Sequence, residues 1–186
     1  MHHRSQRFLP SPRLLHHVLR IRSPACHDPQ TDYRRDEITP AMSVKEGACR
    51  LGRWSVRVTW DEDLVHGVSF TDCELFGEVP PLLAAYCRGH PVDLKGLDSP
   101  ITRGESTFAR VYQAVRDIPY GTTASYGEIA RRVGTSPRAV GHAMRRNPTP
   151  LVIPCHRVIA ADGSLKGFAS GLDMKEALLR MEGALR

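Results

Sequence analysis

The chain has 186 residues, of which 41% are hydrophobic and 25% are charged, so it is long enough for one or two small domains with a buried core. No apolar run approaches the roughly 18 residues that a transmembrane helix requires, which argues against a membrane protein. Five cysteines at irregular spacing, without a C-x-x-C pair, argue against a disulfide framework and a zinc ribbon and favour a reducing compartment. The stretch CRGH at 87–90 is half of a metal-binding pattern whose second half is missing, so no metal is expected.

The net charge of +6 is unevenly distributed along the chain. Residues 1–41 carry 7 basic and 4 acidic side chains, residues 42–100 carry 6 and 9, and residues 101–186 carry 13 and 7. Within the last part, residues 129–161 hold six arginines and no acidic residue. Such a concentration favours a polyanionic partner. A merely solvated basic surface is the alternative.

The first 41 residues are basic and rich in Arg, His and Pro, but they lack the apolar centre of a secretory signal. Met42 opens a better-patterned segment. Residues 1–41 are therefore predicted to be a disordered extension, or the product of an over-long start assignment. A basic targeting presequence is the alternative.

Residues 42–97 are predicted to form a small N-terminal α/β domain. The segment Trp54–Trp60 alternates apolar and polar residues, and LVHGVSF follows after the turn-like DED, which predicts an antiparallel hairpin. The stretch PPLLAAYCR predicts a short helix that opens on proline. The Pro- and Gly-rich stretch GHPVDLKGLDSP then marks the boundary to a second domain, residues 104–186.

The second domain begins with a helical pattern. Apolar residues at three- and four-residue spacing predict a helix with one buried face that Pro119 stops: Phe108, Val111, Tyr112 and Val115. Ser125 and Glu128 have the spacing of a capping box at the start of a short helix, which Gly134 ends.

A second short helix follows at once, with Ser136 as its cap and Pro137 at its first position. Two short helices around a tight turn predict a helix-turn-helix. If the second helix runs from Pro137 to about Arg146, its inward face holds Ala139, Val140, Ala143 and Met144. Its outer face holds Arg138, His142 and Arg145, a plausible reader of nucleic acid.

The same helix contains several small residues, namely Ala139, Gly141 and Ala143. They would let its backbone lie close to DNA, including in the narrower minor groove. Tight packing between helices is the alternative reason for small residues there.

The stretch NPTPLVIPCHRVI, Asn147–Ile159, places Cys155 next to a histidine. A thiol with an ordinary pKa of about 8.5 is mostly protonated at neutral pH, so a nucleophilic Cys155 needs a base. Neighbouring residues point in different directions on a strand or helix, so His156 would act through one bridging water. The alternative is that Cys155 is simply a small buried hydrophobic residue.

NPTPLVIPCHRVI, preceded by SYGEIARRVGTSPRAVGHAMRR and followed by GLDMKEALLRMEG, resembles the O6-alkylguanine-DNA alkyltransferases, also called methylated-DNA–protein-cysteine methyltransferases. The resemblance covers about Thr107 to Ala184 closely, and its P-C-H-R core with the upstream N-P is highly specific. Residues 42–97 fit more weakly the family's variable N-terminal domain. The resemblance implies an α/β (α+β) fold, with a small sheet of ribonuclease-H-like type followed by a winged helix-turn-helix domain. Residues before Met42 match nothing in the family.

The resemblance also implies roles for single residues. Cys155 resembles the alkyl acceptor, His156 the water-mediated base and Glu182 the carboxylate that polarises the histidine. Asn147 resembles the residue that braces the turn before the active-site segment. Arg157 is expected to be a structural ion-pair partner.

For DNA and the extruded base, the resemblance implies a second set of residues. Arg138 resembles the arginine finger that fills the gap left by the flipped nucleotide, and Tyr126 the tyrosine that helps to rotate the target phosphate and contacts the flipped guanine. Pro150 and the backbone at Val158 and Ala169 would line the pocket. The helix pattern adds the DNA-facing residues Ala139, Gly141, His142 and Arg145.

Three residues depart from the common pattern of the family. His142 occupies a position that is often small, and Phe168 and Ala169 stand where tyrosine and serine are frequent. Contacts at these positions would then rely on backbone groups.

The activity implied is irreversible transfer of an alkyl group from O6-alkylguanine, and less well from O4-alkylthymine, in double-stranded DNA to Cys155. The expected protein is a monomer of the cytoplasm, or of the nucleus in a eukaryote, without metal or organic cofactor. The alternatives are a helix-turn-helix regulator and a non-enzymatic sensor of alkyl lesions. The regulator is disfavoured because the second helix is poor in Asn, Gln and Lys, and the sensor because such proteins replace the cysteine, usually with tryptophan.

Overall fold

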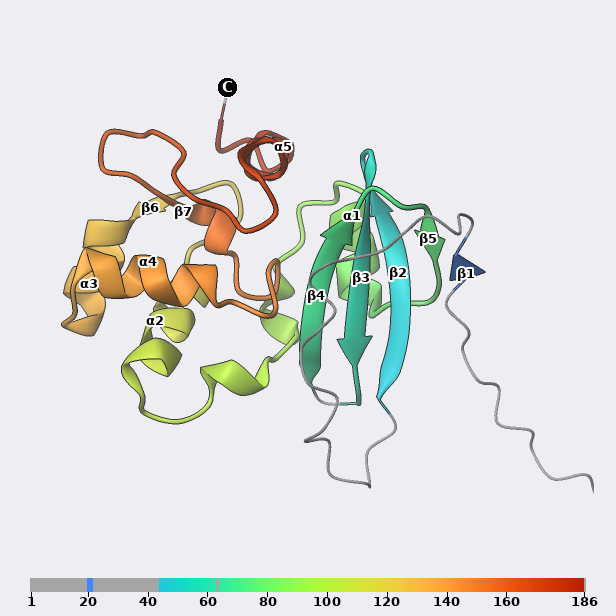
Figure 1. Ribbon diagram of the computed structural model, residues 1–186, viewed down its shortest axis with the longest axis horizontal. Coiled ribbons are helices and arrows are strands. Elements are labelled where there is room, and N and C mark those ends of the chain that lie inside the picture. Colours follow the sequence, from blue (N-terminus) through green and yellow to red (C-terminus); the bar gives the residue numbers. More distant parts are fainter. Residues whose placement is uncertain (1–19, 22–43, 63, 186) are drawn as a thin grey trace, which may run out of the picture.

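The computed structural model describes residues 20–21, 44–62 and 64–185 (Figure 1). Strand β1 (Arg20–Ile21) pairs antiparallel with β5 (Leu75–Phe76). The rest of the expected extension, residues 1–41, lies outside the described residues, so its character stays a prediction.

The N-terminal half is built on a three-stranded antiparallel sheet in the order β2 (Lys45–Leu51), β3 (Trp54–Trp60) and β4 (Val65–Thr71). The expected hairpin of β3 and β4 is confirmed, with Val58 opposite Val68. Strand β2 was not predicted, because its sequence KEGACRL mixes glycine and charged residues and lacks a clear apolar alternation.

Helix α1 (Pro81–Cys87) opens on proline as expected and packs against β2. Its buried face carries Leu83, Tyr86 and Cys87. The Pro- and Gly-rich stretch after it contains two short 3-10 helices, η2 (Leu94–Gly96) and η3 (Pro100–Thr102).

Arg116 is one of the residues that fasten the predicted boundary stretch to the second half of the chain. The Arg116 side chain donates to the backbone oxygen of Leu97 at 2.9 Å and forms an ion pair with Asp98 at 2.7 Å. Arg116 is the last residue of helix α2 (Thr107–Arg116). The stretch is therefore held against the domain that follows it.

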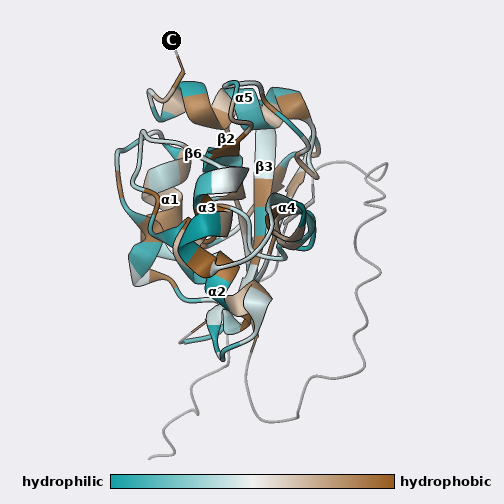
Figure 2. Cartoon of the chain, turned by 90° about the vertical axis from the view of Figure 1, so that its left-hand side faces the viewer, coloured by the Kyte–Doolittle hydropathy of each residue, from teal (hydrophilic) through white to brown (hydrophobic). Residues whose placement is uncertain are grey.

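The helix-turn-helix is confirmed as α3 (Tyr126–Val133) and α4 (Pro137–Arg145). Ser125 and Glu128 form the expected capping box, and Gly134 ends α3 in the left-handed conformation at φ 70°. The Ser136 side chain caps α4 by accepting from the backbone N–H of Ala139. Figure 2 looks onto the outer side of this domain, where α3 is largely hydrophilic.

The remaining elements complete the C-terminal half. They are the parallel pair β6 (Ala124–Ser125) and β7 (Val158–Ile159), the 3-10 helix η4 (Cys155–Arg157) and helix α5 (Leu172–Met181). No helix among the described residues is both long and apolar enough to span a membrane.

Residues 148–158, which include η4, lie between two hydrophobic cores, and this segment is called the seam. Leu151 and Val152 pack into the core of the sheet domain, whereas Ile153, Cys155 and Val158 pack into the core of the helix-turn-helix domain. The backbone N–H of Val68 on β4 also donates to the oxygen of Pro148 at 2.9 Å. Both halves of the chain therefore fix the position of this segment.

Among the described cysteines, Cys49, Cys87 and Cys155 are free thiols and Cys73 is disulfide-bonded. No group of three or more potential metal ligands of the His, Cys, Asp or Glu type occurs in the described part of the chain.

Candidate active site

Cys155 is the first residue of η4 and is 6% exposed. Burial raises the pKa of its thiol above the usual value, against the opposing effects of a hydrogen bond with Asn147 and the positive charge of Lys175. A thiol of raised pKa is a poor nucleophile at neutral pH. The residues around it must therefore supply a base.

Asn147 ties together the turn that precedes Cys155, as expected. Its side-chain amide donates to the oxygen of Ile153 at 2.8 Å and accepts from the backbone N–H of Thr149 at 3.0 Å. Between them, Leu151 has a φ of 75°, a conformation that is rare for a residue with a side chain. The brace offsets this local strain.

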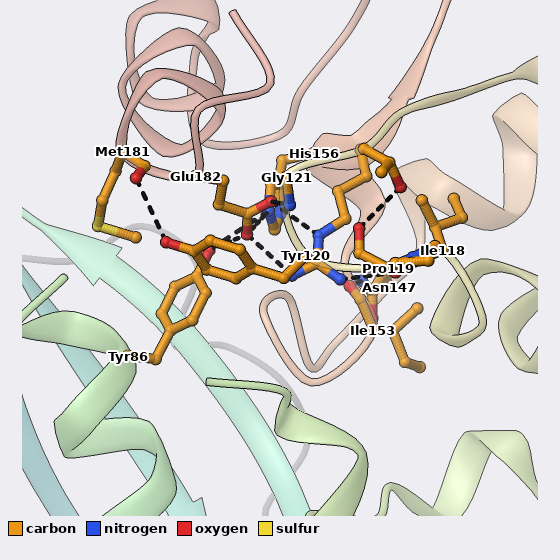
Figure 3. A network of polar contacts seen from close by, with 12 residues as sticks. Tyr86, Ile118, Pro119, Tyr120, Gly121, Asn147, Ile153, His156, Met181 and Glu182 are labelled. Carbon is orange, nitrogen blue, oxygen red and sulfur yellow. Dashed lines mark hydrogen bonds and ion pairs between the residues drawn. The ribbon is translucent and has the colours of Figure 1, made fainter. Parts of the chain in front are cut away.

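Glu182 lies at the centre of a buried polar network, shown in Figure 3. It follows directly after the last helical residue of α5 instead of lying within the helix. Its carboxylate accepts from His156 Nε2 at 2.9 Å and from Arg157 Nε and Nη2 at 2.9 Å each. The hydroxyl of Tyr86 and the backbone N–H of Gly121 donate to the same carboxylate. The expected ion pair of Arg157 is thus made to the carboxylate that binds the histidine.

The network determines the charge of its members. Burial alone would raise the pKa of Glu182, but hydrogen bonds from His156, Arg157 and Tyr86 lower it to about 2. Burial lowers the pKa of His156, although the bond to Glu182 opposes this. At neutral pH Glu182 is therefore a carboxylate and His156 is a neutral imidazole.

A neutral His156 that donates from Nε2 carries its lone pair on Nδ1. This Nδ1 atom is buried, and it has no hydrogen-bond partner among the described residues. This lone pair is able to accept a proton.

A cavity of about 630 Å³ reaches from Cys155 to the surface of the helix-turn-helix. Tyr126 and Ala169 line it as expected, together with residues of α4 and of the loop before α5. Its further lining residues are Arg138, Gly141, His142, Met144, Arg145, Lys166, Gly167 and Phe168.

Two expected pocket residues, Pro150 and Val158, are not among those that line this cavity. Pro150 is buried in the seam, and Val158 is buried at the start of β7, where it pairs with Ala124. The backbone oxygen of Val158 instead accepts from Lys175 Nζ at 2.6 Å. The pocket role expected of Pro150 and of the backbone at Val158 stays a prediction.

Lys175 was missed by the sequence analysis. Its side chain is fully buried and also donates to the oxygen of Lys166 at 3.0 Å, so it joins the cavity loop to β7. Burial lowers its pKa to about 8. The available signal was a lysine on the apolar face of α5, beside Met174, Leu178 and Leu179.

The outer face of α4 is basic, as expected. Arg138, His142 and Arg145 are exposed, and the His142 ring packs edge-on against Phe108 at 5.7 Å. The small residues of this helix differ in their surroundings. Ala143 is fully buried, which fits helix packing.

Gly141 is not required by packing within the chain. A Cβ atom added there would meet only the Tyr126 ring at 3.9 Å, an ordinary van der Waals contact. The smallness of Gly141 therefore favours close approach by an external partner over tight helix packing.

Comparison with known proteins places this site in a family. The family described as 6-O-methylguanine DNA methyltransferase, DNA binding domain, matches residues 106–184. A methylated-DNA–protein-cysteine methyltransferase of Methanosarcina acetivorans is 46% identical over 114 residues, 60% of this chain and 71% of that protein. The protein of the same description from Methanopyrus kandleri is 49% identical over 104 residues, 55% of this chain and 77% of that protein.

Solved structures agree with the sequence comparison. The O6-methylguanine methyltransferase of Mycobacterium tuberculosis is 29% identical, with a TM-score of 0.60 over 76% of this chain and 93% of that chain. The Mycobacterium tuberculosis protein OGT in complex with DNA has a TM-score of 0.61 at 30% identity, over 73% of this chain and 91% of that chain. Fold and site define a DNA repair methyltransferase with a DNA-binding domain. The chain belongs to the methylated-DNA–protein-cysteine methyltransferase family.

The buried carboxylate gives a prediction on stability. Glu182→Gln is expected to lower the free energy of unfolding at pH 7 by about 3 kcal/mol, because the buried Arg157 guanidinium loses its counter-ion. The pKa of Glu182 is lowered from 4.5 to about 2, so its contribution is fully present above pH 4.5 and is lost as the pH falls towards 2. The difference between variant and wild type should shrink over that window in urea unfolding.

A matched control is Glu176→Gln, since Glu176 forms only a surface pair with Arg180 at 2.9 Å. The change that Glu176→Gln causes in the free energy of unfolding should stay within about 0.5 kcal/mol at every pH. A Glu182→Gln difference that stays constant down to pH 2 would contradict the low pKa of the carboxyl.

Proposed function

We propose that Cys155 accepts the alkyl group of O6-alkylguanine in double-stranded DNA, in one irreversible transfer that follows extrusion of the base. The observation that supports this most strongly is the cavity that joins the buried thiol to the basic helix α4. An alkyl group on a paired guanine is out of reach of a buried sulfur, so the base must enter such a cavity.

In the proposed reaction, the proton of the Cys155 thiol passes through a water molecule to Nδ1 of His156. The sulfur attacks the alkyl carbon, the bond between that carbon and O6 breaks, and guanine leaves with the electron pair. The negative charge of Glu182 stabilises the resulting imidazolium through the bond at Nε2, which is 2.9 Å long. This arrangement lets a thiol of raised pKa react at neutral pH.

The departing guanine needs a proton. Burial raises the pKa of Tyr126, which therefore stays protonated at neutral pH. Its hydroxyl lies on the cavity wall, 3.4 Å from the oxygen of Lys166. We assign the proton donation to Tyr126 or to a donor beside it.

The product is a thioether, which has no easy leaving group, so one molecule would repair one lesion. The scheme uses only side chains of this chain and water, without a metal ion or an organic cofactor. O4-alkylthymine, which presents the same kind of alkyl oxygen, is proposed as a slower substrate.

We assign Arg138 as the residue that fills the gap which the extruded base leaves in the DNA base stack. It is exposed near the start of α4 and also lines the cavity. The neighbouring DNA contacts are assigned to His142 and Arg145 and to the close backbone at Ala139 and Gly141. Phosphate contacts by arginines would position the helix, and the cavity would select the lesion.

One chain supplies the thiol of Cys155, the proposed base His156 and the DNA-facing helix α4, so we propose that the protein acts as a monomer. Residues 104–186 would be the DNA-binding and catalytic domain and residues 42–97 its N-terminal support. We propose that it acts in the cytoplasm, or in the nucleus of a eukaryote. A regulator with a structural cysteine is disfavoured because Cys155 faces the cavity.

Cys155→Ala is expected to abolish alkyl transfer and to leave DNA affinity largely intact, because binding depends on the helix and its arginines. The intact protein should be weighed after incubation with a duplex that contains O6-methylguanine. Wild type should gain one methylene, about 14 Da, on the Cys155 peptide. Cys49→Ala, which removes a partly exposed free thiol, is the control and should still gain this mass. Full transfer by Cys155→Ala would refute the assignment.

Arg138→Ala is expected to slow transfer from duplex DNA by at least about tenfold at saturating DNA, because the extruded state loses its stabilisation. Reaction with free O6-benzylguanine, which needs no extrusion, should hardly change. Single-turnover rates on the two substrates test this.

The control for Arg138 is Arg131→Ala, an exposed arginine of α3. Loss of a phosphate contact there should weaken binding and its salt dependence while the rate at saturation is preserved. If Arg138→Ala behaves like this control, or slows the reactions with both substrates equally, Arg138 does not fill the gap left by the extruded base.

A further inference from the structure

One residue of the N-terminal domain reaches the catalytic network. Tyr86 lies on α1 and is fully buried. Its hydroxyl donates to Glu182 Oε1 and lies 3.4 Å from His156 Nε2 (Figure 3). It is therefore a direct neighbour of both members of the carboxylate–imidazole pair.

The position of this phenol is fixed from both sides. Its ring packs edge-on against Tyr120, at 6.1 Å between centroids and 81° between planes. The hydroxyl of Tyr120 donates in turn to the backbone oxygen of Met181, next to Glu182. On its other side, Tyr86 belongs to the core of the sheet domain with Leu83. The packing of the ring therefore holds the Tyr86 hydroxyl within hydrogen-bonding distance of Glu182.

Tyr86 and His156 compete for the same carboxylate oxygen. Oε1 of Glu182 accepts from Tyr86, from His156 Nε2 and from Arg157 Nη2, whereas Oε2 accepts from Arg157 Nε and Gly121. Each further donor on Oε1 reduces the negative charge that the imidazole feels. Fewer donors make the imidazole hold a proton more tightly.

We propose that Tyr86 is a positioning residue of the transfer reaction, which keeps His156 neutral by sharing the Glu182 oxygen that His156 uses. The proposal rests on the proposed role of His156 as the base for Cys155. It makes the N-terminal domain a contributor to the chemistry, through one hydroxyl group.

The other groups that act on His156 come from the C-terminal half of the chain. Glu182 favours the protonated imidazole, whereas Arg157 and Lys175 disfavour it. The phenol of Tyr86 does not ionise near neutral pH, because burial and the charge of Glu182 raise its pKa well above the usual value. Its hydroxyl therefore keeps its proton, which it donates to Glu182, throughout the pH range of the reaction.

The test is the pH dependence of the single-turnover rate with free O6-benzylguanine, which avoids any effect on DNA binding. Tyr86→Phe should move the acid limb of the profile up by about 0.5 to 1 pH unit, because His156 stays protonated to higher pH. At the low-pH end of the profile, the rate of Tyr86→Phe should be about threefold to tenfold lower than that of wild type. On the high-pH plateau, the two rates should agree within about twofold.

Tyr112→Phe is the matched control, since it removes a buried hydroxyl that donates to the backbone oxygen of Ala143 instead of to the carboxylate. Its acid limb should coincide with that of wild type. A Tyr86→Phe limb that also coincides with wild type would overturn the proposal, as would a rate loss that is uniform with pH.

A second variant covers the case in which Tyr86→Phe folds poorly. Site-specific replacement of Tyr86 by 3-fluorotyrosine gives a stronger donor of nearly the same size, so the acid limb should move to lower pH. A shift upwards or no shift would overturn the proposal. Failure of the proposed function is distinguishable, because wild type would then gain no mass on the Cys155 peptide.

Discussion

The buried carboxylate of Glu182 receives hydrogen bonds from four residues in three separate parts of the chain. Tyr86 comes from the N-terminal helix α1, Gly121 from the loop after α2, and His156 and Arg157 from η4. Removing a carboxylate from water costs several kcal/mol unless donors replace its hydration. That requirement draws these elements to the end of α5 and holds the active-site segment between the two cores. The geometry of the site thus follows from satisfying one charge.

The same carboxylate prepares the chemistry. It fixes the proton of His156 on Nε2, which leaves a lone pair on the buried Nδ1. Arg157 neutralises the carboxylate and, with burial, lowers the pKa of the imidazole. In the proposed reaction, this neutral imidazole is the base for the buried thiol of Cys155. Cys155 need not be exposed as a reactive thiolate until a substrate fills the cavity.

The elements that could be predicted from the sequence are those whose ends are set by neighbouring residues. The caps at Ser125 and Ser136 and the left-handed Gly134 depend on neighbouring residues alone, so the helix-turn-helix was found with its bounds. Long-range contacts left no such signal. Tyr86 lies 96 residues from Glu182 in the sequence, and Lys175 shows only as a charge on an apolar face. The burial of Pro150 in the seam and the pairing of Val158 in β7 were likewise decided by packing, which leaves no local signal.

The protonation state of His156 tests most directly whether the Glu182 network prepares the base. It can be measured by ¹⁵N NMR of the imidazole nitrogens in the wild-type protein, assigned by comparison with a His156→Gln variant. At pH 7 the expected spectrum is that of a neutral ring with its proton on Nε2 and a bare Nδ1. A charged imidazolium at pH 7, or a neutral ring with its proton on Nδ1, would contradict the role of the network.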